Sequence, residues 1–273
     1  MCSSDLLNQR LGVYLDETEF AIEEKEPFDL AGLDRYRLSG ELLQARISGQ
    51  EPEARFLLAR SAGDLPHGRV GEAVYESLSD DAEDFFRRIG PLVDPPAGPP
   101  VEIDLRIAEF TLTGRIADLC GDRRVQYRCA RIKARDLLQA WVRHLALNAS
   151  DGAHPRRTVA AGTDRMWEWT PVDEAPALLA DLLALYREGL RRPLPFFPET
   201  SLAFAEQHLE KGKPVPDALK AARNHWRDWN GAGEGEDPYR ERCVGGADPL
   251  AGDFPETALA VFAPLLRHRS KIG

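Results

Sequence analysis

A proline-rich segment, residues 91–100, divides the chain into two parts with different hydrophobic periodicity. It holds five prolines and one glycine in ten residues. Proline lacks a backbone N–H and fixes φ, so such a run fits neither a helix nor a central strand. Apolar residues recur three to five positions apart before it and alternate after it, which indicates helices followed by strands. We therefore predict a boundary or linker at residues 91–100.

The strands are predicted after this boundary. Val101, Ile103, Leu105 and Ile107 alternate with less apolar residues and predict a half-buried strand. Further strands are predicted at residues 110–119, 125–132, 158–161 and 166–169, with a turn at residues 121–124. Successive hairpins of this kind predict an antiparallel meander in the middle of the chain.

Helices are predicted on both sides of the meander and once within it. They cover residues 33–60 (two helices, with a break at residues 49–52), 70–89, 137–145, 175–190, 202–209, 218–229 and 256–267. The predicted fold class is therefore α/β (α+β), a small sheet flanked by many helices. We expect a helical lobe at residues 6–100, a sheet core at residues 101–169 and a second helical lobe at residues 170–273.

The composition is that of an ordinary globular protein. Hydrophobic residues make up 43% and charged residues 29%, and the net charge is −10. No long apolar run or signal peptide is visible, and four scattered cysteines form no CxxC pair. We expect a cytoplasmic protein without a membrane segment. Walker, GxSxG and HExxH sequences are absent as well, so we expect no metal and no cofactor in this chain.

A basic stretch stands out against the acidic average. Residues 111–145 hold eight Lys or Arg and three Asp, a net charge of +5. Such a stretch suits a phosphate backbone, although a solvated sheet face that balances the acidic N-terminal segment would look the same. The candidate DNA-binding residues are Arg115, Arg123, Arg124, Arg128, Arg131 and Lys133. Arg123 and Arg124, at the predicted hairpin tip, are the foremost candidates, and Trp167 and Trp169 are candidates for stacking on bases.

The same stretch contains part of a two-metal nuclease pattern. In such a site an Asp on one strand and a D/E-x-K on the next hold Mg²⁺ and activate water. Here Asp118 and Lys133 match, but Arg131 stands where the second carboxylate is needed. A register shifted by one would place Ala117 and Ala130 there instead. Either register predicts a degenerate site without catalytic residues.

Several segments together resemble a known family. They are residues 7–13 (LNQRLGV), 26–38 (EPFDLAGLDRYRL), 63–68 (GDLPHG), 141–145 (WVRHL), 186–204 (YREGLRRPLPFFPETSLAF) and 235–239 (GEDPY). They resemble the C-terminal domain of the gamma chain, RecC, of exodeoxyribonuclease V, the RecBCD helicase–nuclease. The resemblance covers about residues 6–268. The start, Met1 to Asp5, does not fit it, and we predict a truncated or artefactually joined start there.

The resemblance implies a PD-(D/E)xK restriction-endonuclease-like core that has lost its active site. It implies a non-enzymatic part in duplex unwinding, strand guidance and double-strand-break repair by recombination. The implied partners are the beta (RecB) and alpha (RecD) chains, which use ATP and Mg²⁺, and forked or single-stranded DNA. The gamma chains of the family are several times longer than this chain.

Two other functions remain open from the sequence. An active nuclease would hold Mg²⁺ with Asp118 and an acid such as Glu72 or Glu76, with Lys133 assisting the water. A pure protein–protein adaptor would use the basic stretch to bind an acidic partner.

Overall fold

A computed structural model of the chain describes residues 12, 32–50, 52–227 and 233–272. The predicted truncated start, residues 1–5, lies outside the described residues. None of the described helices is both long enough and apolar enough to cross a membrane.

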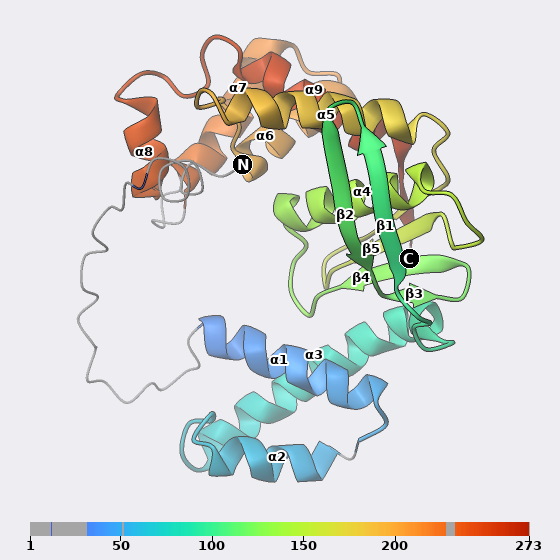
Figure 1. The fold of residues 1–273 in the computed structure, drawn as a ribbon. Helices are drawn as coiled ribbons and strands as arrows, with labels where there is room; N and C mark the ends of the chain where they lie inside the picture. Colours follow the sequence, from blue (N-terminus) through green and yellow to red (C-terminus); the bar gives the residue numbers. More distant parts are fainter. Residues whose placement is uncertain (1–11, 13–31, 51, 228–232, 273) are drawn as a thin grey trace.

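Three helices form the N-terminal lobe: α1 (Gly32–Ile47), α2 (Pro52–Ser61) and α3 (Arg69–Val93) (Figure 1). Leu43 of α1 and Leu78, Phe85 and Ile89 of α3 are buried in one apolar cluster. The prediction that residue 91 ends helical structure is wrong, because Pro91 lies inside the last turn of α3. Near a helix end, proline removes one hydrogen bond and leaves the preceding turns intact.

The central sheet is mixed. Its five strands, in spatial order, are β3 (Leu119–Cys120), β4 (Arg123–Tyr127), β5 (Arg157–Ala161), β6 (Met166–Trp169) and β7 (Arg269–Ile272). β4 and β5 are parallel and joined through helix α4 (Ala134–Ala149), whereas the other neighbours are antiparallel. The predicted antiparallel meander is therefore wrong at this pair, because parallel neighbours need a crossover, which α4 provides. The hairpin of β5 and β6 is confirmed.

Strands β1 (Val101–Ile107) and β2 (Phe110–Ile116) form a separate two-stranded ribbon. Its buried residues Ile103 and Ile116 pack with Leu147 of α4. The predicted strand at residues 110–119 is divided at Asp118, whose positive φ of 65° interrupts the extended backbone. The predicted strand at residues 125–132 begins earlier and ends at Tyr127, where the chain leaves the sheet toward α4.

The remaining helices follow the sheet. They are α5 (Ala175–Gly189), α6 (Pro198–Ala205) with a π-helical turn (Glu206–Glu210), α7 (Val215–Trp226), a 3₁₀ turn (Glu234–Glu236), α8 (Pro238–Val244) and α9 (Phe254–His268). The C-terminal helices thus match the predicted pattern, whereas α8 and strand β7 were not predicted.

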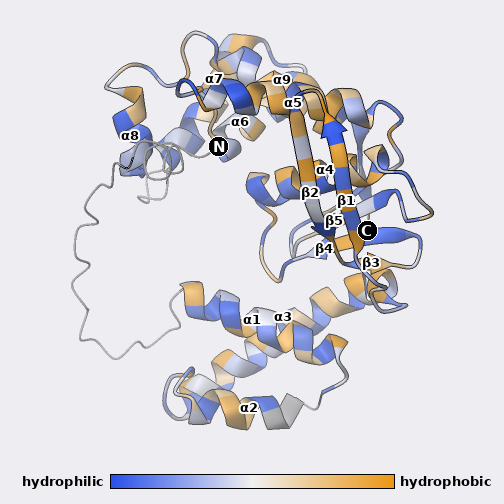
Figure 2. Ribbon diagram, viewed as in Figure 1, coloured by the Kyte–Doolittle hydropathy of each residue, from blue (hydrophilic) through white to orange (hydrophobic). Residues whose placement is uncertain are grey.

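The central sheet is packed on both faces. Helices α4, α5 and α9 bury Ala160 and Trp169 on one face. The N-terminal helices bury Ala161 and Met166 on the other. Figure 2 shows hydrophobic residues on the strands and on the helices that cover them. The chain is therefore a mixed α/β protein with small sheets and many helices, and α4 is fixed against the sheet along its length.

Candidate nucleic-acid interface

The loop between β4 and α4, residues 128–133, is held in place by carboxylates from other parts of the fold. The Ile132 N–H donates to Asp164 Oδ1 at 2.9 Å, and the Ala134 N–H donates to Glu199 Oε1 at 2.8 Å. The loop also packs tightly on Gly162, where a Cβ would lie 2.7 Å from the Ile132 nitrogen. Since the backbone is fixed at these points, the side chains of the loop project from defined positions.

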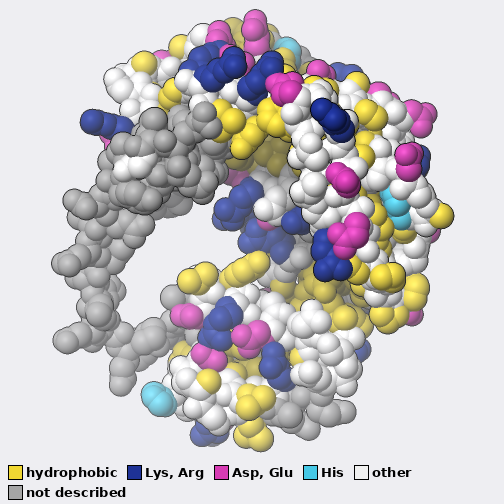
Figure 3. Space-filling model, viewed as in Figure 1, with side chains coloured by type: hydrophobic (Ala, Val, Ile, Leu, Met, Phe, Trp, Pro, Cys, Tyr) yellow, Lys and Arg dark blue, Asp and Glu magenta, His cyan; other side chains and the backbone are white. Residues whose placement is uncertain are grey.

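Four cations on this loop and on α4 are exposed: Arg131, Lys133, Arg135 and Arg143. We call them the α4 cation cluster. Among the residues that the structure describes, none of the four forms an ion pair, and only Arg143 contacts a polar side chain, Gln126, at 3.4 Å. Figure 3 shows Lys and Arg side chains gathered on the wall of a hollow between the N-terminal and C-terminal helices.

Two acids beside this cluster, Asp136 and Glu199, form no ion pair with its members among the described residues. Asp136, in the first turn of α4, is occupied by the Arg128 guanidinium at 2.6 Å and by the Lys133 N–H at 2.9 Å. Burial, together with the nearby Glu234 carboxylate, raises the pKa of Glu199, and Lys133 and the Ala134 N–H oppose that shift. The positive charge of the α4 cation cluster therefore faces solvent and is free to attract an anion.

Other predicted DNA-binding arginines are used in ion pairs within the chain. Arg115 binds Glu102 across the β1–β2 ribbon at 2.7 Å. Arg123 binds Asp122 at 2.7 Å and approaches Glu168 at 4.0 Å. Arg128 also lies over the Tyr36 ring, 4.9 Å from its centroid. The charge of these three side chains is largely compensated within the chain.

Arg124 is buried, and the prediction that it contacts DNA from an exposed hairpin tip is wrong. The residue is only 1% exposed, because it belongs to β4 and faces α4. Its Nη2 donates to Gln126 Oε1 at 2.9 Å, whereas its Nε and Nη1 have no partner among the described residues. Burial and the nearby Arg143 lower the pKa of Arg124 to about 10.

The two candidate stacking residues lie against the protein interior. Trp169 is fully buried, and its Nε1 donates to the Leu265 carbonyl at 3.2 Å. Trp167 is half-buried beneath the Arg269 guanidinium, which lies 3.9 Å from the ring centroid. The prediction of base stacking is therefore wrong for Trp169, and Trp167 has its ring face occupied by Arg269.

The three residues of the degenerate nuclease pattern are placed in different surroundings. Asp118 lines a groove of about 930 Å³ between α1, α3 and β4. Lys133 precedes α4 and acts electrostatically on Glu199, and Arg131 lies exposed in the loop before it. Within the described part of the chain, no hydrogen bond or ion pair joins Asp118 to Arg131 or Lys133.

The acids of the alternative nuclease site lie on α3. Glu72 and Glu76 are exposed in its first two turns, and Figure 1 shows this end of α3 away from the sheet. In the described ranges, no three His, Cys, Asp or Glu side chains are grouped closely enough to hold a metal ion.

Arg135 and Arg143 were not among the predicted site residues, although both belong to the basic stretch. The signal that identifies them is helical spacing. They are eight positions apart, which places both near one side of α4, while Leu137, Trp141 and Leu145 face the core.

Comparison with known proteins gives the family of this chain. The model of the RecC C-terminal domain family matches residues 4–209. The RecBCD enzyme subunit RecC of Escherichia coli K12 is 32% identical over 197 residues, which are 71% of this chain and 17% of that protein. The subunit from Mycolicibacterium smegmatis is 30% identical over 207 residues, 68% of this chain and 18% of that protein.

The chain therefore belongs to a family of domains found in a subunit of a multichain enzyme. The family is the RecC C-terminal domain family. The chain spans less than a fifth of the length of these two relatives.

Proposed function

We propose that this chain is a non-catalytic, DNA-contacting module of a cytoplasmic RecBCD-type exodeoxyribonuclease V. In this role it guides the separated strands during duplex unwinding in double-strand-break repair by recombination. Its partners are RecB (beta) and RecD (alpha) chains, which use ATP and Mg²⁺, and forked or single-stranded DNA. Support for the partners comes from the relatives, which are named as RecC subunits of the RecBCD enzyme.

The observation that carries the DNA-contacting role is the α4 cation cluster. Its four side chains are exposed, and among the described residues they have no carboxylate partner, so contact with phosphates would not first require breaking an ion pair. Lysine and arginine on a fixed backbone are the usual ligands of DNA phosphates, and such contacts carry no sequence preference. This is the property that strand guidance requires.

The fold class within the proposal is a PD-(D/E)xK restriction-endonuclease-like core with a degenerate active site. A mixed sheet flanked by helices is consistent with such a core. Arg131, in the place of a metal-binding carboxylate, is consistent with loss of the active site. Arginine at that position repels a divalent cation, so the nuclease chemistry is assigned to the RecB chain.

The test is DNA binding by the full-length protein in complex with its RecB and RecD chains. We expect Arg131→Ala/Lys133→Ala/Arg135→Ala/Arg143→Ala to raise the apparent Kd for a forked duplex at least about tenfold at low salt, because four phosphate contacts are lost. Fluorescence anisotropy with labelled forked DNA measures this apparent Kd.

The matched control removes the same charge from paired arginines elsewhere. Arg87→Ala/Arg115→Ala/Arg192→Ala/Arg223→Ala breaks ion pairs with Asp84, Glu102, Glu188 and Asp248. We expect this variant to bind the fork about as tightly as the unaltered complex. Equal weakening in both variants would show that net charge, and not the α4 cation cluster, governs binding.

The absence of catalysis has its own test. Asp118→Asn is expected to leave Mg²⁺-dependent degradation of linear DNA by the complex unchanged. Asparagine tolerates the positive φ of residue 118, so the substitution removes the charge without straining the backbone. Loss of degradation in this variant would instead support an active nuclease site in the chain.

A further inference from the structure

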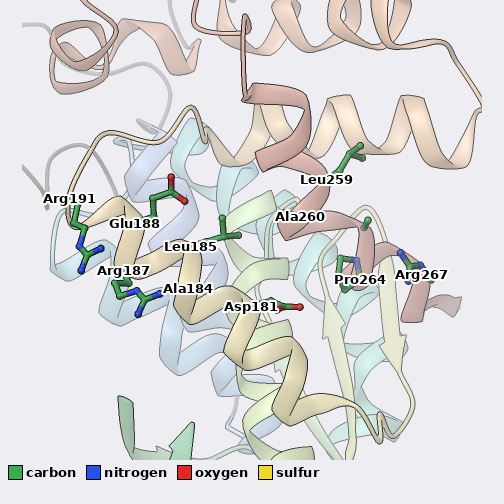
Figure 4. Close-up of a pocket in the computed structure, with 11 residues that line it drawn as sticks. Asp181, Ala184, Leu185, Arg187, Glu188, Arg191, Leu259, Ala260, Pro264 and Arg267 are labelled. Carbon is green, nitrogen blue, oxygen red and sulfur yellow. The ribbon is translucent and has the colours of Figure 1, made fainter. Parts of the chain in front are cut away.

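A groove between α5 and α9 combines an apolar floor with cations toward both ends (Figure 4). Its volume is about 770 Å³. The apolar lining residues are Ala184, Leu185, Leu259, Ala260, Ala263 and Pro264. Arg187 and Arg191 lie at one end, Arg267 lies at the other, and Asp181 lies between them. The groove is thus large enough for several side chains and is bounded by charge.

Helix α5 is more apolar than its burial in the chain requires. Of its fifteen residues, only Ala175 and Leu179 are buried. Leu182 and Leu185 pack against the core but remain partly exposed, and Tyr186 is 44% exposed. Figure 2 shows hydrophobic residues along α5 and the neighbouring α9. A partly exposed apolar helix beside an apolar groove is typical of a protein-binding surface.

The charges around the groove favour an acidic occupant. Arg187 is paired with Glu109, and Glu188 is paired with Arg192. Within the described residues, Arg191 and Arg267 form no ion pair, and these two cations stand toward opposite ends of the floor. An occupant with an acidic residue toward each end would pair with both.

The floor favours a protein segment over nucleic acid. Its lining contains no aromatic ring, so unpaired bases would find no stacking partner. In α9, Pro264 has no N–H to donate to the carbonyl of Ala260, so that acceptor lacks its helical partner. A donor on the bound segment could satisfy it. Aliphatic contacts with acidic flanks describe an amphipathic peptide segment.

We propose that the α5–α9 groove binds a short amphipathic segment of another chain of the helicase–nuclease, apolar in its middle and acidic at its ends. The identity of the partner rests on the proposed function. The chemistry of the segment rests on the groove itself, which is formed by α5 and α9 and contains none of the α4 cation cluster.

The first experiment is assembly of the full-length protein with its RecB and RecD chains. We expect Arg191→Glu/Arg267→Glu to weaken assembly at least about tenfold, because two attractive contacts become repulsive. Ala184→Trp is expected to do the same by filling the exposed groove, without touching a buried residue. Mass photometry over a concentration series gives the apparent Kd, and thermal melting of each variant checks that it is folded.

Arg156→Glu together with Arg242→Glu is the matched control. Both arginines are exposed outside the groove, and the charge change is the same. This variant is expected to assemble like the unaltered chain. Assembly that is unchanged in both groove variants, or weakened equally in the control, overturns the proposal.

The second experiment identifies the occupant. A photoreactive benzoyl-phenylalanine at Ala263 in the assembled complex is expected to crosslink to a RecB or RecD peptide with an apolar middle and acidic flanks, which mass spectrometry identifies. Crosslinks to DNA, to this same chain, or to no partner overturn the proposal.

The outcomes also separate the two proposals. Failure of the unaltered chain to assemble with these partners overturns both. If the groove variants assemble normally and the α4 cluster variant loses fork binding, only the groove proposal is overturned. If the groove variants fail to assemble and the α4 cluster variant binds the fork normally, only the DNA-contacting role is overturned.

Discussion

At the scale of single residues, Arg124 shows how burial changes the meaning of a charged side chain. It occupies β4 with one side-chain hydrogen bond, to Gln126, and two unpartnered nitrogens among the described residues. Replacing a buried ion pair by apolar side chains of similar volume is often neutral or stabilising, and a buried charge without an opposite charge is costlier still. We expect Arg124→Met to raise the free energy of unfolding by about 1 kcal/mol, as measured by chemical denaturation.

The control for this prediction is Arg115→Met on the exposed ribbon, where the ion pair with Glu102 is solvated and worth little. We expect almost no change there. If Arg124→Met instead destabilises the protein by several kcal/mol, the guanidinium must be bound to a buried anion or water.

His144 is a second buried polar residue with a testable consequence. Burial lowers its pKa to about 4, with smaller effects from His268 and Arg124, while its ring contacts Thr158 Oγ1 at 3.1 Å. The unfolded chain therefore binds a proton near pH 6.5 that the folded chain binds only near pH 4. The contribution of His144 to the free energy of unfolding is fully present above pH 6.5. It is lost as pH decreases toward 4, by roughly 3 kcal/mol in total.

His144→Gln is expected to remove this part of the pH dependence. Denaturation at several pH values between 7 and 4 should give a smaller slope than in the unaltered chain, with the exposed His67→Gln variant as control. Equal slopes in the two variants would show that the pKa of His144 is the same in the folded and the unfolded chain.

At the scale of elements, periodicity was sufficient for helices and insufficient for strand pairing. Leu137, Trp141 and Leu145 recur at helical spacing and are buried in α4, as the sequence predicts. The parallel pairing of β4 with β5 has no such signal, because the same strands could form an antiparallel pair. Strand β7 is only four residues long, and tertiary contacts define it: Arg269 binds Glu206 and Glu210 on the π-helical turn.

The first N–H of α4 is bound by a carboxylate from another helix, Glu199 of α6. Glu199 Oε1 accepts the Ala134 N–H, while burial and the Glu234 carboxylate raise the pKa of Glu199. A raised pKa means that the carboxylate form weakens the fold as pH rises through the titration range above 4.5. Glutamine retains the acceptor and removes the charge.

We therefore expect Glu199→Gln to be at least as stable as the unaltered chain at neutral pH. Glu199→Ala loses the acceptor and is expected to be less stable than Glu199→Gln by about 1 kcal/mol. Thermal or chemical denaturation measures both, and Glu236→Ala, an exposed acid on the nearby 3₁₀ turn, is the control. A Glu199→Gln variant that is as unstable as Glu199→Ala would contradict the role of the acceptor.

At the scale of the whole molecule, the basic stretch was visible in the sequence, but the sequence did not show which of its cations remain exposed and unpaired. Ion pairs with Glu102, Asp122 and Asp136, together with the burial of Arg124, remove half of its eight cations from a surface role. These contacts depend on strand register and on packing, neither of which the order of residues reveals. Of the predicted DNA-binding residues, Arg131 and Lys133 are the two that remain exposed without an ion pair among the described residues, because they lie in the loop before α4.

Salt dependence distinguishes the local cluster from the net charge of −10. Each phosphate that a cation neutralises releases counterions and adds about 0.9 to the negative slope of log K against log salt for duplex DNA, or about 0.7 for single strands. Removing the four members of the α4 cation cluster should therefore reduce the slope for a single strand by roughly three, as measured by anisotropy titrations across salt concentrations. The full-length complex should be compared with the variant that lacks four paired arginines, whose slope should be unchanged. A slope that stays the same in the cluster variant would mean that these cations do not contact phosphates, whatever the change in Kd at one salt concentration.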